Sequence, residues 1–311
     1  MTQPARTALL VSLLLLFCAA LSLAQNPSAP VLEDTVVKIS DHVYAIPGKG
    51  RPVVPNIGII VGDRATMVVD TGMGLKNGEL VVHEAEKVGK SPALYLTTTH
   101  AHPEHVTGEP AFPPAAKWII NEAQNEDLQA ILPGFITTFS NRSPEMKVML
   151  QDVKMRAPDI VFDHEAKVDL GGVTVSMTYY GPAHTHGDEV VFVEPDSVLM
   201  PGDLVENKIF PLIPDSTGSA KNWLAILDKL EPLHPSQIMP DHGAFGDGSL
   251  IAQEKAFFVA LESRVSELKK QGKSAQDTVQ TVYTEFLAKY PDWTSQNALR
   301  TAAQRMFDEL P

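Results

Sequence analysis

Four apolar, strand-like runs along this chain each lead into a residue that can bind a metal ion. The runs and the residues that follow them are Leu94–Thr99 with His100, Met177–Tyr180 with His184, Val198–Met200 with Asp203, and Ile238–Met239 with His242. Functional sites of α/β proteins gather at the carboxyl ends of strands, where loops converge. Glycine and proline stand close to these residues and suit sharp turns that direct a side chain inward. The pattern therefore predicts strands whose ends meet at one site.

The first of these runs continues into a dense group of possible ligands. The segment Thr-Thr-Thr-His-Ala-His-Pro-Glu-His places His100, His102, Glu104 and His105 within six residues. Neutral imidazole offers a nitrogen lone pair near physiological pH, which makes histidine the commonest metal ligand. Because the preceding residues have the pattern of a buried strand, a solvated polar loop is the less favoured interpretation. The spacing indicates ligands for two ions.

Strand-like and helical runs alternate along most of the chain. Strands are expected at residues 36–39, 42–46, 56–61, 66–70, 94–99, 117–120, 160–162, 173–180, 189–193, 197–200 and 237–239. Helices are expected at 76–88, from about 122 to 155, and at 221–230, 250–271, 275–290 and 295–310. Strand groups interleaved with helices indicate an α/β architecture in which helices cover the sheets.

The first 24 residues are predicted to form a secretory signal peptide. Arg6 precedes an uncharged, leucine-rich run that ends in the small-x-small pattern Ser22-Leu23-Ala24. A membrane anchor is the alternative, but the run is short for a spanning helix. The proline-containing residues 25–34 are expected to be a flexible segment. We therefore expect a secreted, periplasmic protein without stable membrane insertion after cleavage.

Composition excludes several kinds of chemistry. The only cysteine, Cys18, lies in the predicted signal peptide, so the mature chain offers no disulfide, no thiolate nucleophile and no cysteine ligand. The formal net charge of −13 argues against nucleic-acid binding, which depends on Lys and Arg to replace counterions. A small-molecule substrate is the expected partner.

Taken together, these residues resemble the metallo-β-lactamase superfamily, whose pattern is His-x-His-x-Asp-His, then His, then Asp or Cys, then His. The matching residues are His100, His102, Glu104, His105, His184, Asp203 and His242, preceded by the strand and turn Met67–Gly72. The resemblance covers roughly residues 36–252. It implies an α/β fold, a four-layer αββα sandwich over 35–252, with residues 253–311 as a helical C-terminal extension packed on the same domain.

The resemblance also implies a ligand set for each of two ions. The first ion is assigned His100, His102 and His184. The second ion is assigned Glu104, His105 and His242. Asp203 is expected to bridge the ions, and Asp70 is expected either to support the site from beneath or simply to form a turn. Zinc, as one or two ions per chain, is the expected cofactor, with another divalent metal as the alternative.

Glu104 departs from the family pattern, which has Asp at this position. Its additional methylene extends the carboxylate by about 1.5 Å, whereas metal–ligand distances vary by only about 0.2 Å. A working two-metal site, in which Glu104 is a ligand or the base that orients water, is one interpretation. A single-metal enzyme, a different metal and a loss of activity are the others.

The function implied by the resemblance is hydrolysis by a metal-activated water, acting on an ester, thioester, lactone or amide (β-lactam-like) bond. A dedicated class B-like β-lactamase is one alternative, and a non-catalytic metal- or partner-binding protein of the same fold is another. Branches with a cysteine ligand are excluded because the mature chain has none. A flavin-coupled di-iron enzyme would have Glu in place of His102, and nuclease branches carry basic surfaces that are absent here.

Two further features have open interpretations. The apolar run Phe210–Ile213 either forms a rim of the substrate pocket or packs beneath its loop. His186, two residues after His184, either contacts substrate or lies on a loop surface, and the second interpretation is favoured.

Overall fold

The computed structural model describes residues 30–311, so the predicted signal peptide and residues 25–29 lie outside the described range. Two β-sheets form its centre. In spatial order, the first sheet consists of β1 (Val37–Lys38), β2 (Val43–Ile46), β3 (Ile57–Val61), β4 (Thr66–Val69), β5 (Leu94–Thr97), β6 (Lys117–Asn121) and β7 (Ile160–Phe162). The second consists of β12 (Gln237–Ile238), β11 (Val198–Met200), β10 (Glu189–Glu194), β9 (Thr174–Tyr179) and β8 (Glu165–Asp169).

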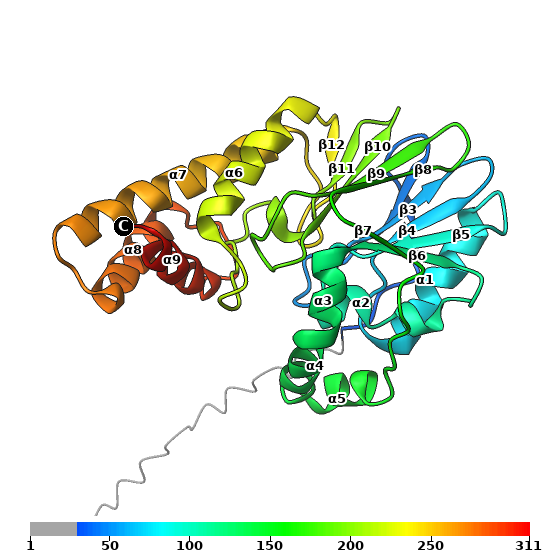
Figure 1. Cartoon of the computed structure of the whole chain (residues 1–311), viewed down its shortest axis with the longest axis horizontal. Coiled ribbons are helices and arrows are strands. Elements are labelled where there is room, and N and C mark those ends of the chain that lie inside the picture. The colour runs from blue at the N-terminus through cyan, green and yellow to red at the C-terminus, as the bar shows by residue number, and fades with distance from the viewer. Residues whose placement is uncertain (1–29) are drawn as a thin grey trace, which may run out of the picture.

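Helices cover the outer faces of both sheets and project beyond them (Figure 1). They are α1 (Gly74–Val88), α2 (Pro103–Val106), α3 (Glu122–Ala130), α4 (Leu132–Ser140), α5 (Pro144–Leu150), α6 (Ala220–Leu230), α7 (Ser249–Lys270), α8 (Ala275–Lys289) and α9 (Ala298–Glu309). Three of them begin at a serine, Ser143, Ser219 or Ser274, whose side chain accepts a hydrogen bond from the backbone N–H three residues later. Such caps satisfy donors that a helix start leaves unpaired.

Alternation along the strands divides the hydrophobic residues among the layers. On β4, Met67 and Val69 pack into the space between the sheets, whereas Val68 packs toward α1. On β10, Val191 faces the same inner space, whereas Val190 packs toward α6 and α7. Successive side chains of a strand point to opposite faces, so each sheet needs an apolar partner on both sides. The predicted α/β sandwich of four layers, αββα, is confirmed.

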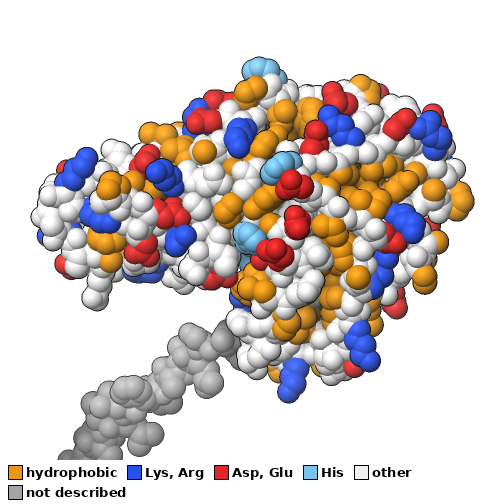
Figure 2. Space-filling view, viewed as in Figure 1, with side chains coloured by type: hydrophobic (Ala, Val, Ile, Leu, Met, Phe, Trp, Pro, Cys, Tyr) orange, Lys and Arg blue, Asp and Glu red, His pale blue; other side chains and the backbone are white. Residues whose placement is uncertain are grey.

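The C-terminal helices form a block with α6 at one end of the molecule (Figure 1). Trp223 of α6 and Phe258 of α7 are fully buried in one cluster, with ring centroids 4.9 Å apart. Charged side chains are scattered over the outer surface of this block (Figure 2). The boundary predicted between residues 252 and 253 falls inside α7, so the extension is continuous with the sandwich.

The structure differs from the sequence prediction around residues 122–155 and at β8. The helical stretch expected from about 122 to 155 is divided into α3, α4 and α5, and Pro133 and Pro144 stand in the first turns of α4 and α5. Proline is tolerated there because the first N–H groups of a helix have no partner within the helix. Strand β8 was not expected because its side chains are only exposed or half-buried, which leaves no apolar signal.

The start of the described chain is anchored rather than free. Asn77 of α1 donates to the carbonyl of Pro30 and accepts from the N–H of Leu32, whose side chain is buried. Within the segment predicted to be flexible, Pro30 and Leu32 are thus hydrogen-bonded to α1, and the flexibility of residues 25–34 stays a prediction. Within residues 30–311, none of the helices combines the length and apolar character needed to cross a membrane.

Glu189, at the start of β10, links the two sheets through a fully buried carboxyl group. It contacts the hydroxyl of Thr97, the last residue of β5, and lies 3.2 Å from the backbone N of Asn121 on β6. Burial raises the pKa of Glu189 from 4.5 to about 8, and the hydrogen bonds from Thr97 and Asn121 oppose the rise only in part. The folded chain therefore holds this proton more tightly than the unfolded chain does.

This shift predicts a stability that depends on pH. The contribution of protonated Glu189 is complete below about pH 4.5 and is lost as pH rises through about 8. Between about pH 5 and about pH 9, we expect the free energy of unfolding of the wild-type protein to fall by several kcal/mol more than that of Glu189→Gln. Urea titrations at both pH values measure the difference. Glu165→Gln, at an exposed position of β8, is the control, and parallel pH profiles for all three proteins would contradict the prediction.

Candidate metal centre

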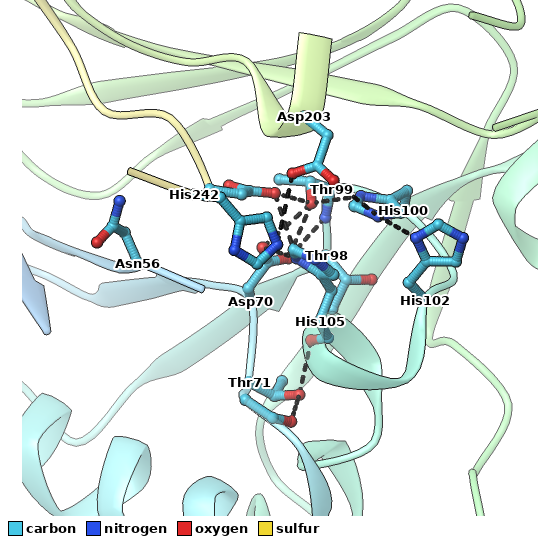
Figure 3. A network of polar contacts seen from close by, with 12 residues as sticks. Asn56, Asp70, Thr71, Thr98, Thr99, His100, His102, His105, Asp203 and His242 are labelled. Carbon is cyan, nitrogen blue, oxygen red and sulfur yellow. Dashed lines mark hydrogen bonds and ion pairs between the residues drawn. The ribbon is translucent and has the colours of Figure 1, made fainter. Parts of the chain in front are cut away.

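The residues at the predicted strand ends lie close together, and Figure 3 shows His100, Asp203 and His242 among them. The residues that follow strands are His100 after β5, His184 after β9, Asp203 after β11 and His242 after β12. The short helix α2 starts directly after His102 and carries Glu104 and His105. All seven residues predicted as ligands belong to groups whose donor atoms lie within 4.8 Å of one another.

The first group contains three histidines and one carboxylate. His102 Nδ1 lies 3.0 Å from His100 Nε2 and 3.2 Å from His184 Nε2. Asp203 Oδ2 lies 3.3 Å from His184 Nε2 and 3.9 Å from His100 Nε2. Three nitrogen donors and one oxygen donor around a common centre are a set that suits zinc.

The second group contains Glu104, His105 and His242. His105 Nε2, Glu104 Oε2 and Asp203 Oδ1 are all buried, and none has a hydrogen-bond partner within residues 30–311. Asp203 Oδ1 lies 3.8 Å from His242 Nε2, so the two oxygens of this carboxylate face different groups. Buried polar atoms without partners are costly, and a cation would satisfy them. The donor set therefore fits two ions with Asp203 between them.

Hydrogen bonds on the far side of the rings orient two of the histidines. His184 Nδ1 lies 2.6 Å from the carbonyl oxygen of Leu212, which can only accept, so Nδ1 carries the proton. His105 Nδ1 lies 2.8 Å from Asp70 Oδ2. In both rings Nε2 is left to face the group of ligands. Such outer partners set the tautomer of a metal-binding histidine.

Asp70 lies beneath the site rather than within it. Its Oδ1 accepts from the backbone N of Thr99 at 2.8 Å, and its Oδ2 contacts His105. Asp70 has a φ of 68°, in the left-handed region that Asp tolerates better than most residues. Burial raises its pKa to about 7, and the nearby Asp241 carboxylate adds to the rise. The position suits the supporting role predicted for this residue.

Asp241 and Asn56 also stabilise the site, although no role was predicted for either residue. Asp241 Oδ2 lies 3.2 Å from His105 Nδ1 and accepts from the Thr99 hydroxyl at 2.6 Å. Asn56 Nδ2 donates to the carbonyls of Pro240 at 2.7 Å and Gly243 at 3.1 Å, on either side of His242. The Pro-Asp-His-Gly turn was a visible signal for Asp241, but Asn56 lies 184 residues from Pro240 and gives no local signal.

Burial keeps most of the histidines in the form that a metal requires. The pKa values of His100 and His102 lie well below 6.5, mainly because burial disfavours the charged ring and neighbouring histidines repel it. Burial likewise lowers the pKa of His184, and that of His242 to about 4. Neutral imidazole is the metal-binding form, so these rings are prepared to accept an ion.

Glu104 reaches the second group despite its additional methylene. It stands in the first turn of α2, is buried, and has a carboxylate oxygen within 4.8 Å of the donor nitrogens of His105 and His242. Burial raises its pKa, while the two histidines act in the opposite direction.

A pocket of about 570 Å³ opens beside the two groups of ligands. Its lining includes Phe135 and Phe139 of α4, and Phe210 and Leu212 from the apolar run that the sequence marked as a possible rim. Of that run, Leu212 is partly exposed, whereas Ile213 is buried and packs beneath the loop. Residues of this run therefore both line the pocket and pack beneath it, and contact with substrate stays a prediction.

His186 belongs to neither group of ligands. Its Nδ1 lies 3.3 Å from Asp127 Oδ1 on α3, and about a third of its side chain is exposed (36%). This contact ties the loop after β9 to α3, as expected for a surface histidine rather than a ligand.

Comparisons with known proteins agree with this geometry. Residues 50–242 match the model of the metallo-beta-lactamase superfamily. A curated linear primary-alkylsulfatase from Pseudomonas sp. is 21% identical over 215 residues, which are 60% of this chain and 40% of that protein. This chain therefore spans less than half the length of that relative.

Two solved structures share the fold. The stereoselective inverting sec-alkylsulfatase Pisa1 from Pseudomonas sp. superposes with a TM-score of 0.68 at 16% identity, over 88% of this chain and 49% of that one. A metallo-beta-lactamase from Pontibacter korlensis superposes with a TM-score of 0.57 at 19% identity, over 72% of this chain and 98% of that one. With its ligand groups and a family match that spans most of its length, this chain belongs to the metallo-beta-lactamase superfamily.

Proposed function

We propose that this protein is a zinc-dependent hydrolase with a two-metal centre, acting on a small molecule that contains an ester, thioester, lactone or amide bond. The observation that carries the proposal is the pair of buried donor groups that share Asp203. His100, His102 and His184 would hold one ion, and Glu104, His105 and His242 the other. Export to the periplasm, as expected from residues 1–24, is part of the same proposal.

Zinc bound at such a centre supplies a hydroxide nucleophile near neutral pH and a Lewis acid for the substrate oxygen. The chain's own residues do the positioning. Leu212 and Asp70 hold the rings of His184 and His105 so that Nε2 faces the centre. Glu104, buried beside His105 and His242, either binds the second ion or accepts a proton from the attacking water. Phe135 packs edge-on against His102, with ring centroids 4.6 Å apart, and shields it from solvent.

Sulfate esters are a second candidate substrate class. The similarity to Pisa1 extends over more of this chain than the similarity to the Pontibacter korlensis enzyme. The pocket also combines apolar walls with Arg51 and Arg142, which suits an anionic ester with an apolar chain. A β-lactamase and a non-catalytic binding protein remain the other candidates.

A substrate screen distinguishes these candidates. Zinc-loaded protein is assayed with a chromogenic carboxylic ester, a thioester, a lactone, a cephalosporin and an alkyl sulfate. Turnover of carboxylic esters or lactones supports the main proposal, and release of inorganic sulfate supports the second candidate. Bound zinc without turnover of any member of the panel would favour a binding protein.

His102→Ala tests the first group of ligands. Because His102 Nδ1 faces both His100 and His184, its loss should release zinc and lower turnover by about 10²–10³-fold. Zinc per chain by atomic absorption and initial rates on the best substrate measure both effects. His186→Ala is the matched control, because His186 lies outside both groups and should leave both quantities unchanged. An unaltered rate in His102→Ala would refute the proposal.

Glu104→Gln separates the two roles left open for this residue. The amide keeps the length of the side chain but lacks the charge that a cation ligand supplies. If Glu104 is a ligand, we expect about one zinc per chain instead of about two after dialysis. If it is the base, both ions remain and turnover alone falls, by about 10²–10⁴-fold. Wild-type zinc content together with wild-type turnover would exclude both roles.

A further inference from the structure

Apart from the predicted ligands, the pocket lining carries two permanent cations. Arg51 comes from the loop between β2 and β3, and Arg142 follows α4. The remaining carboxyl of the lining is Glu206. The other side chains around the pocket are mostly apolar, including Phe135, Phe139, Leu212 and Ala298.

The loop that carries Arg51 is held in a defined conformation beside the ligands. Asn56 Oδ1 accepts from the N–H of Gly48, and Asn56 Nδ2 bonds the turn around His242. Val53 has a φ of 52°, a left-handed conformation that a β-branched residue rarely adopts. Its side chain packs against a buried cluster that includes Phe139 of α4 and Met146 of α5. Strained residues of this kind gather at functional sites, where the surroundings fix them.

The Arg51 guanidinium is only partly satisfied by the protein. Its Nε donates to the carbonyl of Gly48 at 3.2 Å, and its Nη1 lies 3.8 Å from a carboxylate oxygen of Glu33, which makes a closer ion pair with Lys49. Its Nη2 is buried and has no hydrogen-bond partner within residues 30–311. A buried guanidinium nitrogen that no protein acceptor pairs is costly, so a ligand that supplies an acceptor there would gain affinity. Guanidinium groups bind carboxylates, sulfates and phosphates in a planar, two-bond geometry.

Arg142 places a second positive charge in the same pocket. Its guanidinium lies 3.7 Å from the centroid of the Phe139 ring, a cation–π contact that holds it against the apolar wall. Arg142 and His102 line the same pocket. The positive charge of Arg142 therefore acts within the pocket that contains the predicted centre.

We propose that Arg51, assisted by Arg142, binds an anionic group of the substrate, so that the pocket selects esters that carry both a negative charge and an apolar chain. The inference rests on the proposed hydrolase function and adds the residue that determines specificity. Two divalent ions would offset the charges of Glu104 and Asp203 and leave the arginines to attract an anion.

The test compares two esters that release the same leaving group. Mono-4-nitrophenyl glutarate is anionic, and 4-nitrophenyl butyrate is neutral. In Arg51→Met, the ratio of kcat/KM for the anionic ester to that for the neutral ester should fall by at least about tenfold, because a hydrogen-bonded charge is lost. Arg51→Lys should recover part of the ratio, because lysine restores the positive charge but not the planar, two-bond geometry of the guanidinium. Arg64→Met is the matched control, since Arg64 is exposed and pairs with Asp169.

A binding measurement separates this inference from the proposed function. Calorimetry with octane-1-sulfonate, which has no bond to hydrolyse, and zinc-loaded protein needs no turnover, and Arg51→Met should weaken binding by about tenfold relative to wild type and Arg64→Met. Failure of zinc-loaded wild type to cleave either ester would refute the hydrolase but leave this measurement decisive for the anion site. Equal affinity in wild type and Arg51→Met, or no detectable binding to wild type, would overturn the inference, as would an unchanged substrate ratio.

Discussion

One buried histidine joins the two sheets of this protein. His105 Nδ1 lies 2.8 Å from Asp70, which follows β4 of the first sheet, and 3.2 Å from Asp241, which follows β12 of the second. Burial lowers the pKa of His105, but the two carboxylates prevail and raise it well above its usual range. The ring is thus held as a cation between the halves of the sandwich. The other ring nitrogen of His105, Nε2, belongs to the second group of ligands, with Glu104 and His242.

The atoms around His105 at this edge of the sandwich would be stabilised by a bound metal ion. Without an ion, His105 Nε2, Glu104 Oε2 and Asp203 Oδ1 are buried and unpaired within the described residues. A ligand that satisfies them in the folded state alone stabilises that state. An ion at His105 Nε2 displaces its proton, so metal binding and proton release are coupled at this position. The same contact therefore determines both how the sheets are joined and how readily the centre is loaded.

The sequence predicted those features that leave a local pattern. Runs of apolar residues on β4 and β10 marked the strands, and turns with Gly or Pro marked the residues at the strand ends. Strand β8 was not predicted because its only apolar positions, Ala166 and Val168, are half-buried. No role was predicted for Arg51, for a different reason. Its relevance depends on a loop conformation fixed by Asn56 and the distant turn at His242, and no pattern around residue 51 shows that contact.

The C-terminal helices stabilise the candidate metal centre as well as the fold. The Thr301 hydroxyl on α9 accepts from the N–H of Ile213, and Arg305 donates to the carbonyl of Gly218. Helix α9 therefore holds both ends of the loop segment from Ile213 to Gly218. The same loop supplies the Leu212 carbonyl that fixes the His184 tautomer. The family match ends at residue 242, before any of these helices begins. Residues of α9, which lies outside the shared motif, thus help to orient His184, one of the histidines that the motif identifies. The C-terminal helices therefore contribute to the geometry of the centre although they supply none of its predicted ligands.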